Sequence, residues 1–241
     1  MTARNTTSAS GLPTRDRLAA EAARMFAQRG YHGTSINDLA AALGIQKSSL
    51  YAHISHKADL LADIALAGAA AFHTALDALP DTAAAGERLE LALRAHLTVV
   101  ESQLDVATVW LQEWRYLTGE ARDVFLRERH RYEERIRDLF EAAVRSGELR
   151  RDLDVDDATL VFLSVANWAY TWLMPQTDVG GLTSRLMSVL LGGMGQVTPS
   201  ATGLPARVPS CRCLRARRCG SGARTSASWD YRWSLARCSA A

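Results

Sequence analysis

The chain has 241 residues and a mass of 26.3 kDa, and 48% of its residues are hydrophobic while 22% are charged. These values exclude a fibrous or wholly disordered protein and allow one large domain or two small ones, each with a core. The net charge of +2 is unevenly divided, because residues 1–57 carry +4, residues 58–203 carry −9 and residues 204–241 carry +7. We therefore expect the two ends to have different tasks from the middle.

No secretory signal or membrane span is expected. The N-terminus lacks an apolar run, and no cysteine precedes Cys211, so a reducing, cytoplasmic location is predicted. Residues 158–177 carry no charge over a length close to that of a bilayer, but Thr159, Ser164 and Asn167 interrupt them. A helix that is buried on two sides explains this stretch better than a membrane helix does.

The periodicity predicts an all-α fold. Hydrophobic residues recur at steps of three and four, alternating strand patterns are absent, and proline and glycine are scarce before residue 180. About nine helices are predicted, over residues 13–29, 35–43, 46–52, 57–79, 84–101, 104–117, 120–146, 155–174 and 182–196.

Helix boundaries follow from local signals. Ser35, with Asp38 three residues later, resembles a capping box at the start of the second helix. Gly30, Gly44 and Gly147 each follow a helical pattern, where a left-handed residue is expected to end the helix.

The first three helices indicate a helix-turn-helix. Leu39, Leu43, Ile45 and Leu50 are expected to close a small core that fixes the angle between the second and third helices. The exposed face of the third helix would then offer short polar side chains, one cation and one aromatic to a DNA major groove. These residues are Gln46, Lys47, Ser48, Ser49, Tyr51 and His53. Lys57, at the start of the fourth helix, is placed to bind a phosphate.

Three motifs carry a resemblance to a known family. They read Gly30-Tyr31-His32-Gly33-Thr34-Ser35-Ile36-x-x-Leu39-Ala40, then Leu43-Gly44-Ile45-x-Lys47-x-x-Leu50-Tyr51-x-His53, then Lys57-x-Asp59-Leu60-Leu61. Over about residues 13–62 the chain resembles the DNA-binding domain of the TetR family of bacterial repressors. Departures at Gln46, Ala52 and Ile54 leave the operator sequence open, but not DNA binding.

The resemblance implies roles for individual residues. Phosphate contacts are implied for Thr34, Ser35, Tyr51, His53 and Lys57. Base or mixed contacts are implied for Asn37, Lys47, Ser48 and Ser49. The implied function is a ligand-responsive repressor that is released from a palindromic operator, acts as a homodimer and is not an enzyme.

The predicted body resembles the ligand-binding, dimerising domain of the same family. Residues 110–117 and 166–172, with Pro175, look like the branch that regulates fatty-acid and steroid breakdown in actinobacteria, whose effectors are often acyl-CoA thioesters. Trp110/Trp114 and Trp168/Trp172 are each spaced four apart, so each pair is expected on one helical face. Core and interface packing is the preferred explanation of any single tryptophan, and the alternative is an apolar effector pocket, for which the candidates are Phe72, Trp110, Trp114 and Trp168.

The expected domain division is a disordered leader over residues 1–12, a helix-turn-helix domain over 13–57, an effector-binding and dimerisation domain over 58–198, and a disordered tail over 199–241. The tail is rich in Arg, Ser and Cys. Its four cysteines match no usual zinc spacing, so an unselected extension is favoured over a zinc site or a nucleic-acid arm.

Other readings of the chain remain weaker. The acids from Asp152 to Asp156 imitate the start of a calcium loop, but Asp157 and Leu163 occupy its glycine and closing glutamate positions, so a helix N-terminus is preferred. His130 and Glu133 lack the second set of ligands that a di-iron bundle needs. No metal or cofactor is expected. A helical enzyme and a sequence-independent DNA-coating protein remain the alternatives.

Overall fold

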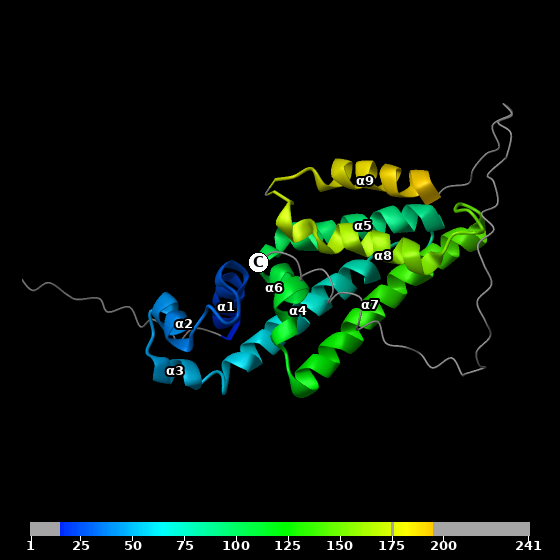
Figure 1. Cartoon of the computed structure of the whole chain (residues 1–241). Helices are drawn as coiled ribbons and strands as arrows, with labels where there is room; N and C mark the ends of the chain where they lie inside the picture. Colours follow the sequence, from blue (N-terminus) through cyan, green and yellow to red (C-terminus); the bar gives the residue numbers. More distant parts are fainter. Residues whose placement is uncertain (1–14, 175, 195–241) are drawn as a thin grey trace, which may run out of the picture. The chain divides into compact units, whose positions relative to one another are not determined.

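The computed structural model describes residues 15–174 and 176–194, and over these it contains nine α-helices, two short 3-10 helices and no β-strand. The all-α prediction is therefore confirmed. The predicted leader at 1–12 and the predicted tail at 199–241 lie outside the described residues. The α-helices are α1 Arg15–Arg29, α2 Ile36–Leu43, α3 Lys47–Tyr51, α4 Lys57–Asp77, α5 Ala85–Ser102, α6 Leu104–Gln112, α7 Gly119–Ser146, α8 Val155–Asn167 and α9 Val179–Met194 (Figure 1). The 3-10 helices are η1 Glu113–Tyr116 and η2 Ala169–Thr171.

The helix ends of the N-terminal region agree with the sequence signals. The Ser35 hydroxyl accepts the Asp38 N–H at 3.1 Å, and the Asp38 carboxylate accepts the Ser35 N–H at 2.8 Å, so the predicted capping box is confirmed. The same bonds hold the pKa of the Asp38 carboxyl below its usual value. Gly44 has a φ of 68°, which is the left-handed conformation that ends α2 and starts the turn to α3.

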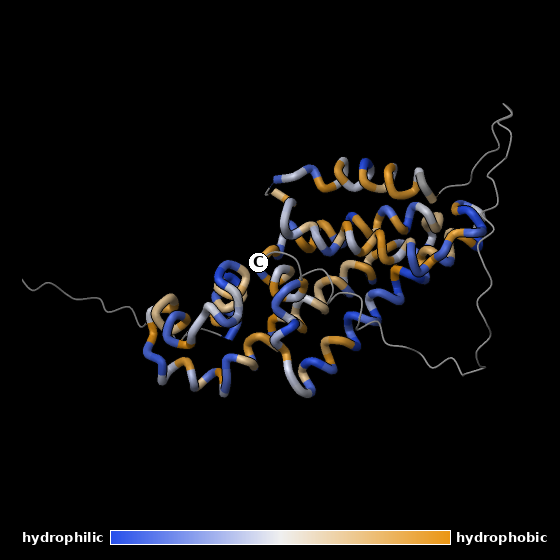
Figure 2. Tube along the Cα trace, in the orientation of Figure 1, coloured by the Kyte–Doolittle hydropathy of each residue, from blue (hydrophilic) through white to orange (hydrophobic). Residues whose placement is uncertain are grey.

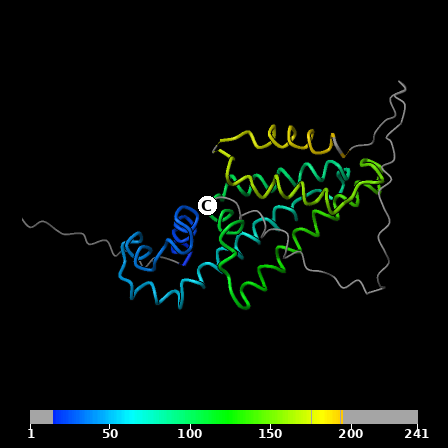
Figure 3. Tube along the Cα trace, in the orientation of Figure 1, coloured from blue at the N-terminus to red at the C-terminus, as the bar shows by residue number. Residues whose placement is uncertain are grey.

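A small core closes the first three helices. Leu18, Met25 and Phe26 of α1 are fully buried, as are Leu39 of α2 and Leu50 of α3. Leu43 and Ile45 are half-buried against them. The core predicted for the helix-turn-helix is therefore present, and the chain passes from α3 by a short turn into α4 (Figure 3).

The remaining helices form a bundle in which α4, α5 and α7 pack against one another. Helix α6 packs on α4 and on α1, α8 packs on α7, and α9 packs on α5 (Figure 1). By length and composition α4 is the one described helix apolar enough to cross a membrane. Its Leu60, Leu61 and Phe72 are buried among the other helices, which is the arrangement of a core helix.

Two predicted helices end earlier than expected. The helix predicted over 104–117 is α6, which stops at Gln112 and continues as η1. The Arg115 guanidinium donates to the Gln112 carbonyl at 2.5 Å. In a longer α-helix this carbonyl would instead accept a backbone N–H. A third predicted helix, over 182–196, begins earlier instead, because the Asp178 carboxylate accepts the Gly181 N–H and caps α9 from Val179.

The helix predicted over 155–174 ends at Asn167 and is followed by η2. The Thr171 hydroxyl donates to the Trp168 carbonyl at 2.7 Å, and the Trp172 N–H bonds to Ala169 in a tighter turn. The expectation that Trp168 and Trp172 share one helical face is therefore wrong.

Candidate functional site

Helix α3 presents the polar face that the sequence predicts. Leu50 is fully buried, whereas Lys47, Ser48 and Tyr51 are exposed and Ser49 is half-buried. Tyr51 is 48% exposed, so its side chain is accessible at the surface. The Lys47 ammonium lies 5.9 Å from the centre of this ring, so a cation and an aromatic stand together at the surface.

Three further candidate residues border this face. Ser35 and Asn37 are exposed at the start of α2, and the Ser35 hydroxyl also serves as the helix cap. His53 is half-buried after α3, and its Nε2 has no hydrogen-bond partner. Together with Lys47, Ser48, Ser49 and Tyr51, these residues lie on or beside the two helices of the helix-turn-helix.

Thr34 does not reach this surface with its side chain. It is 1% exposed, and its hydroxyl lies 3.2 Å from the Met25 carbonyl and 3.1 Å from the Gly30 carbonyl. The hydroxyl therefore fastens the loop between α1 and α2 to the end of α1. The implied phosphate contact does not agree with this placement.

Lys57 is half-buried and turned toward the same loop. Its ammonium donates to the Tyr31 carbonyl at 2.9 Å and to the Thr34 carbonyl at 2.8 Å, and lies 4.1 Å from the centre of the Tyr31 ring. Desolvation lowers the pKa of this lysine. Because an ammonium has three donors, one remains for a phosphate.

The helix-turn-helix is joined to the bundle at η1. Glu113 is 8% exposed, and its carboxylate accepts the Tyr31 N–H at 2.7 Å. The Tyr116 ring stacks on Tyr31 at 5.9 Å and meets the His32 ring edge-on at 4.4 Å. A partly buried hydrogen bond and an aromatic contact thus tie the α1–α2 loop to the residues directly after α6.

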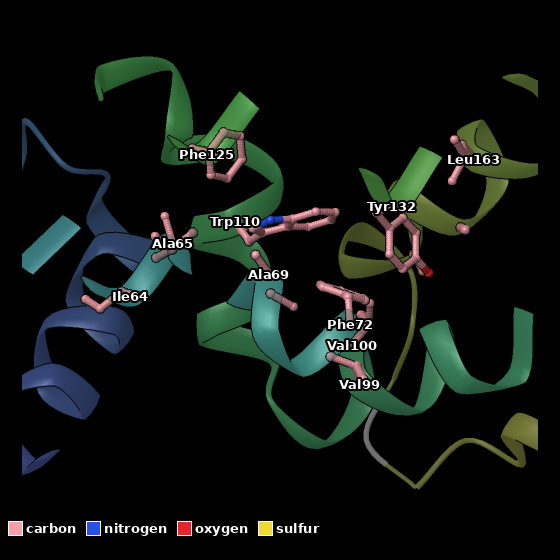
Figure 4. Packing of buried hydrophobic residues seen from close by; sticks show 14 of the residues in the cluster. Ile64, Ala65, Ala69, Phe72, Val99, Val100, Trp110, Phe125, Tyr132 and Leu163 are labelled. Carbon is pink, nitrogen blue, oxygen red and sulfur yellow. The ribbon is translucent and has the colours of Figure 1, made fainter. Parts of the chain in front are cut away.

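The bundle contains a buried cluster of four ring side chains, which we call the aromatic cluster: Phe72 of α4, His96 of α5, Trp110 of α6 and Tyr132 of α7. The Phe72 ring centre lies 4.5 Å from both His96 and Trp110, and 5.9 Å from Tyr132. Figure 4 shows Phe72, Trp110 and Tyr132 facing one another from three helices.

The other two predicted pocket residues lie outside this cluster. Trp114 stacks on Phe125 with ring centres 5.5 Å apart, and Arg129 lies 5.2 Å above it. Trp168 is 56% exposed and contacts the Tyr170 ring edge-on. Of the four predicted pocket residues, Phe72 and Trp110 are therefore in contact, and Trp114 is connected to Trp110 only through Phe125. Trp168 lies apart from these rings, next to Tyr170.

His96, Tyr132 and Glu113 were not among the predicted site residues. His96 lies between Leu93 and Leu97 on the apolar face of α5, and Tyr132 lies at the same helical spacing as Phe125 and Ile136 on α7. For His96 and Tyr132, the sequence signal was a polar group on the apolar face of a helix. For Glu113 the sequence gave no signal, because its partner is 82 residues away in sequence.

The side chains of the two motifs that resembled metal sites make helix-capping and ion-pair contacts. The Asp154 carboxylate accepts the N–H groups of Asp156 and Asp157 and so caps α8, as the preferred reading of this acidic run predicted. His130 pairs with Glu134 at 3.1 Å. Within residues 15–174 and 176–194, no three His, Cys, Asp or Glu side chains lie close enough to hold a metal ion.

Two family models match the chain. "Bacterial regulatory proteins, tetR family" matches residues 18–64, and "Tetracyclin repressor-like, C-terminal domain" matches residues 82–189. The transcriptional repressor KstR2 of Mycobacterium tuberculosis is 28% identical over 189 residues, which cover 75% of this chain and 92% of that protein.

Solved structures agree in fold over most of the chain. The TetR family regulator PfmR of Thermus thermophilus has a TM-score of 0.69 and 31% identity, covering 76% of this chain and 98% of PfmR. AibR, solved with isovaleryl coenzyme A and operator DNA, has a TM-score of 0.67 and 28% identity, covering 73% of this chain and 96% of AibR. The chain therefore belongs to the TetR family: it is a dimeric, DNA-binding transcriptional regulator that responds to a small molecule, and it is not an enzyme.

Proposed function

We propose that this regulator represses transcription from a palindromic operator and leaves it when a small apolar or acyl-CoA-type effector binds the helical bundle. The observation that carries the proposal is the polar face of α3, which Leu50 anchors in the core while Lys47 and Tyr51 remain exposed. In a twofold dimer, two such helices about 34 Å apart would enter successive major grooves.

The contacts that we assign to DNA follow the positions of the side chains. Asn37, Lys47, Ser48 and Ser49 would read bases, because they are exposed or half-exposed on α2 and α3. Ser35, Tyr51 and His53 would hold phosphates, with the remaining donor of Lys57. Thr34 would contribute by fixing the loop from which these residues extend.

The effector would enter the bundle at the aromatic cluster, where Phe72 and Trp110 are in contact and Trp114 lies behind Phe125. Aromatic walls with few polar groups are typical of ligand sites. The complex of AibR with isovaleryl coenzyme A supports an acyl-CoA-type effector for a chain that is 28% identical to it.

A short path connects this cluster to the DNA-binding helices. Trp110 lies on α6, which ends at Gln112, and the next residue is Glu113, which accepts the Tyr31 N–H. An effector that moves α6 would therefore also move the loop before α2. Release follows if the effector binds the displaced state more tightly than the DNA-bound state.

The same proposal covers domain limits and location. Residues 13–57 would form the DNA-binding domain, 58–198 the effector-binding and dimerisation domain, and 199–241 a separate tail. Because its operator would lie on the bacterial chromosome, the regulator would act in the cytoplasm.

Selection of bound fragments from a genomic DNA pool by the purified chain tests the proposal. The expected product is a set of fragments that share one palindrome, with half-sites about one helical turn apart. Equal recovery of all fragments, together with a steep loss of binding in salt, would instead indicate a sequence-independent DNA-coating protein.

A further inference from the structure

Lysine is rare in this chain. Of its 28 basic residues only Lys47 and Lys57 are lysine, and the others are arginine. An arginine guanidinium stays protonated in proteins, whereas a lysine amine can lose its proton and act as a nucleophile. The chain therefore offers two side-chain amines to an acylating reagent.

Lys57 is protected from such a reagent. It is half-buried, and its nitrogen donates to the Tyr31 carbonyl at 2.9 Å and to the Thr34 carbonyl at 2.8 Å. Burial lowers the pKa of Lys57, which increases its share of free amine, but an acylated nitrogen keeps a single N–H. One of the two carbonyls would then lose its donor, so the hydrogen bonds of the loop oppose acylation here.

Lys47 is accessible. Its side chain is exposed on α3, and its ammonium makes no hydrogen bond or ion pair with any residue that the structure describes. Its nitrogen lies 5.9 Å from the centre of the Tyr51 ring, near the outer limit of a cation–π interaction. Helix α3 itself contains no acidic residue. The two amines therefore differ in their surroundings, because one is held by a loop and the other is open to solvent.

We propose that Lys47 is a modification site, at which an acyl thioester acylates the side-chain amine and thereby weakens DNA binding. The inference rests on the proposed function, because that proposal assigns Lys47 to the DNA contacts and an acyl-CoA-type molecule to the effector. The unprotonated nitrogen attacks the thioester carbonyl carbon, a C–N bond forms and the C–S bond breaks. The sulfur leaves as a thiolate and takes up the proton that the nitrogen releases. The products are an amide and a free thiol.

The modification changes the polar face of α3 in charge and in size. The amide carries no charge and has one N–H in place of three donors. An acyl group is added on the face that, in the proposed complex, enters the major groove. In a dimer each half-site loses one cation, so fewer counterions are released on binding and the affinity depends less on salt.

Acetyl coenzyme A is the probe for the chemistry. The full chain is incubated with it at mildly alkaline pH, and the modified residues are mapped by mass spectrometry of peptides. Lys47 should be acetylated at least about tenfold faster than Lys57. Coenzyme A without an acyl group is the control reagent and should leave both residues unmodified.

The effect on DNA is measured after the free reagent has been removed, so that only the covalent change remains. Fluorescence anisotropy with the selected operator should show about tenfold weaker binding by the acetylated wild type. The slope of log affinity against log salt should become shallower by about two, one for each half-site.

Lys47→Arg is the matched variant, and it is compared with its own untreated sample. It keeps the positive charge but offers no amine, so treatment should not change its affinity. Three results would overturn the inference: acetylation that is absent from Lys47 or favours Lys57, full operator affinity in the acetylated wild type, or an equal loss of affinity in treated Lys47→Arg.

Peptide mapping needs no DNA, so this inference and the proposed function fail separately. A chain that selects no palindrome, but loses affinity for every duplex when Lys47 is acetylated, would overturn the palindromic repressor and support the site. Selection of a palindrome by a chain whose Lys47 stays unmodified would do the reverse.

Discussion

Two polar residues, one in the α1–α2 loop and one at the start of α4, stabilise this loop in a way that the sequence did not indicate. Lys57 and Thr34 both direct hydrogen bonds to backbone carbonyls of or beside this loop, at distances of 2.8 to 3.2 Å. The carbonyls that hold Lys57 are 23 and 26 residues away in sequence, so helical periodicity contains no information about them. The exposure of Lys47 and Tyr51, by contrast, could be predicted from helical spacing, because Leu50 is the residue of this short helix that faces the core.

Lys47→Ala and Tyr51→Ala test the assignment of α3. Each should weaken binding to the selected operator at least about fivefold, because each removes one contact to a base or phosphate. Sedimentation should show that both variants remain dimeric. Arg122→Ala, an exposed charge change on α7, is the control for net charge, and fluorescence anisotropy with a labelled duplex measures all three. Undiminished affinity in both α3 variants would refute the assignment.

The pH dependence of stability should report His96. The unfolded chain binds a proton near the ordinary pKa of 6.5, whereas burial lowers the pKa in the folded chain to about 3. Between these values the unfolded state holds more protons, so stability falls as pH falls. The loss attributable to His96 should be about 2 kcal/mol between pH 7 and pH 5.

Urea unfolding at the two pH values measures this loss. The difference between pH 7 and pH 5 should shrink in His96→Phe and persist in His130→Gln, which alters an exposed histidine of α7. An unchanged difference in His96→Phe would show that this ring is not buried in its neutral form.

At the scale of elements, the sequence predicted each helix but placed some of its ends wrongly. The capping box at Ser35 and the left-handed Gly44 are local signals, and both were confirmed. The early ends of α6 and α8 depend on 3-10 turns held by Arg115 and Thr171, which no local rule distinguishes from further helix. Half of the aromatic cluster was predicted, since Phe72 and Trp110 were expected pocket residues but His96 and Tyr132 were not.

Glu113 links two of these elements, η1 and the α1–α2 loop. In Glu113→Ala the partly buried Tyr31 N–H loses its acceptor, which should lower the free energy of unfolding by about 1 kcal/mol. Exchange of the Tyr31 amide hydrogen should accelerate accordingly.

Glu113→Gln keeps a carbonyl oxygen at this position, so slow exchange of the Tyr31 amide should be largely retained. Hydrogen exchange followed by NMR distinguishes the variants. If the Tyr31 amide exchanges at the same rate in wild type and in Glu113→Ala, this hydrogen bond is not part of the proposed path between the effector and DNA.

For the whole molecule, several of the exposed apolar residues lie on or next to the last two helices. Val161 of α8, Trp168 after it and Val189 of α9 are all exposed in one copy of the chain, and Val189 is 78% exposed. Figure 2 shows hydrophobic residues along both α8 and α9. The regulator is a dimer, and we expect these two helices to form its interface, because exposed apolar residues often mark such surfaces.

Val189→Asp should therefore convert the dimer into a monomer in sedimentation equilibrium, since burying two unpaired carboxylates opposes association. Operator affinity should fall with it, because a monomer reaches one half-site. Leu104→Asp places the same change at an exposed leucine at the start of α6 and should leave the dimer intact. A dimeric Val189→Asp would exclude this part of α9 from the interface.

Dimethyl sulfate protection of the selected operator shows whether α3 enters the major groove in both halves of the dimer. This reagent methylates guanine N7 in the major groove and adenine N3 in the minor groove. Two patches of protected guanines about 10 base pairs apart are expected, and the protection of both should weaken in Tyr51→Ala. Protection of adenines alone, or a guanine pattern that Tyr51→Ala and Lys47→Ala leave unchanged, would contradict it.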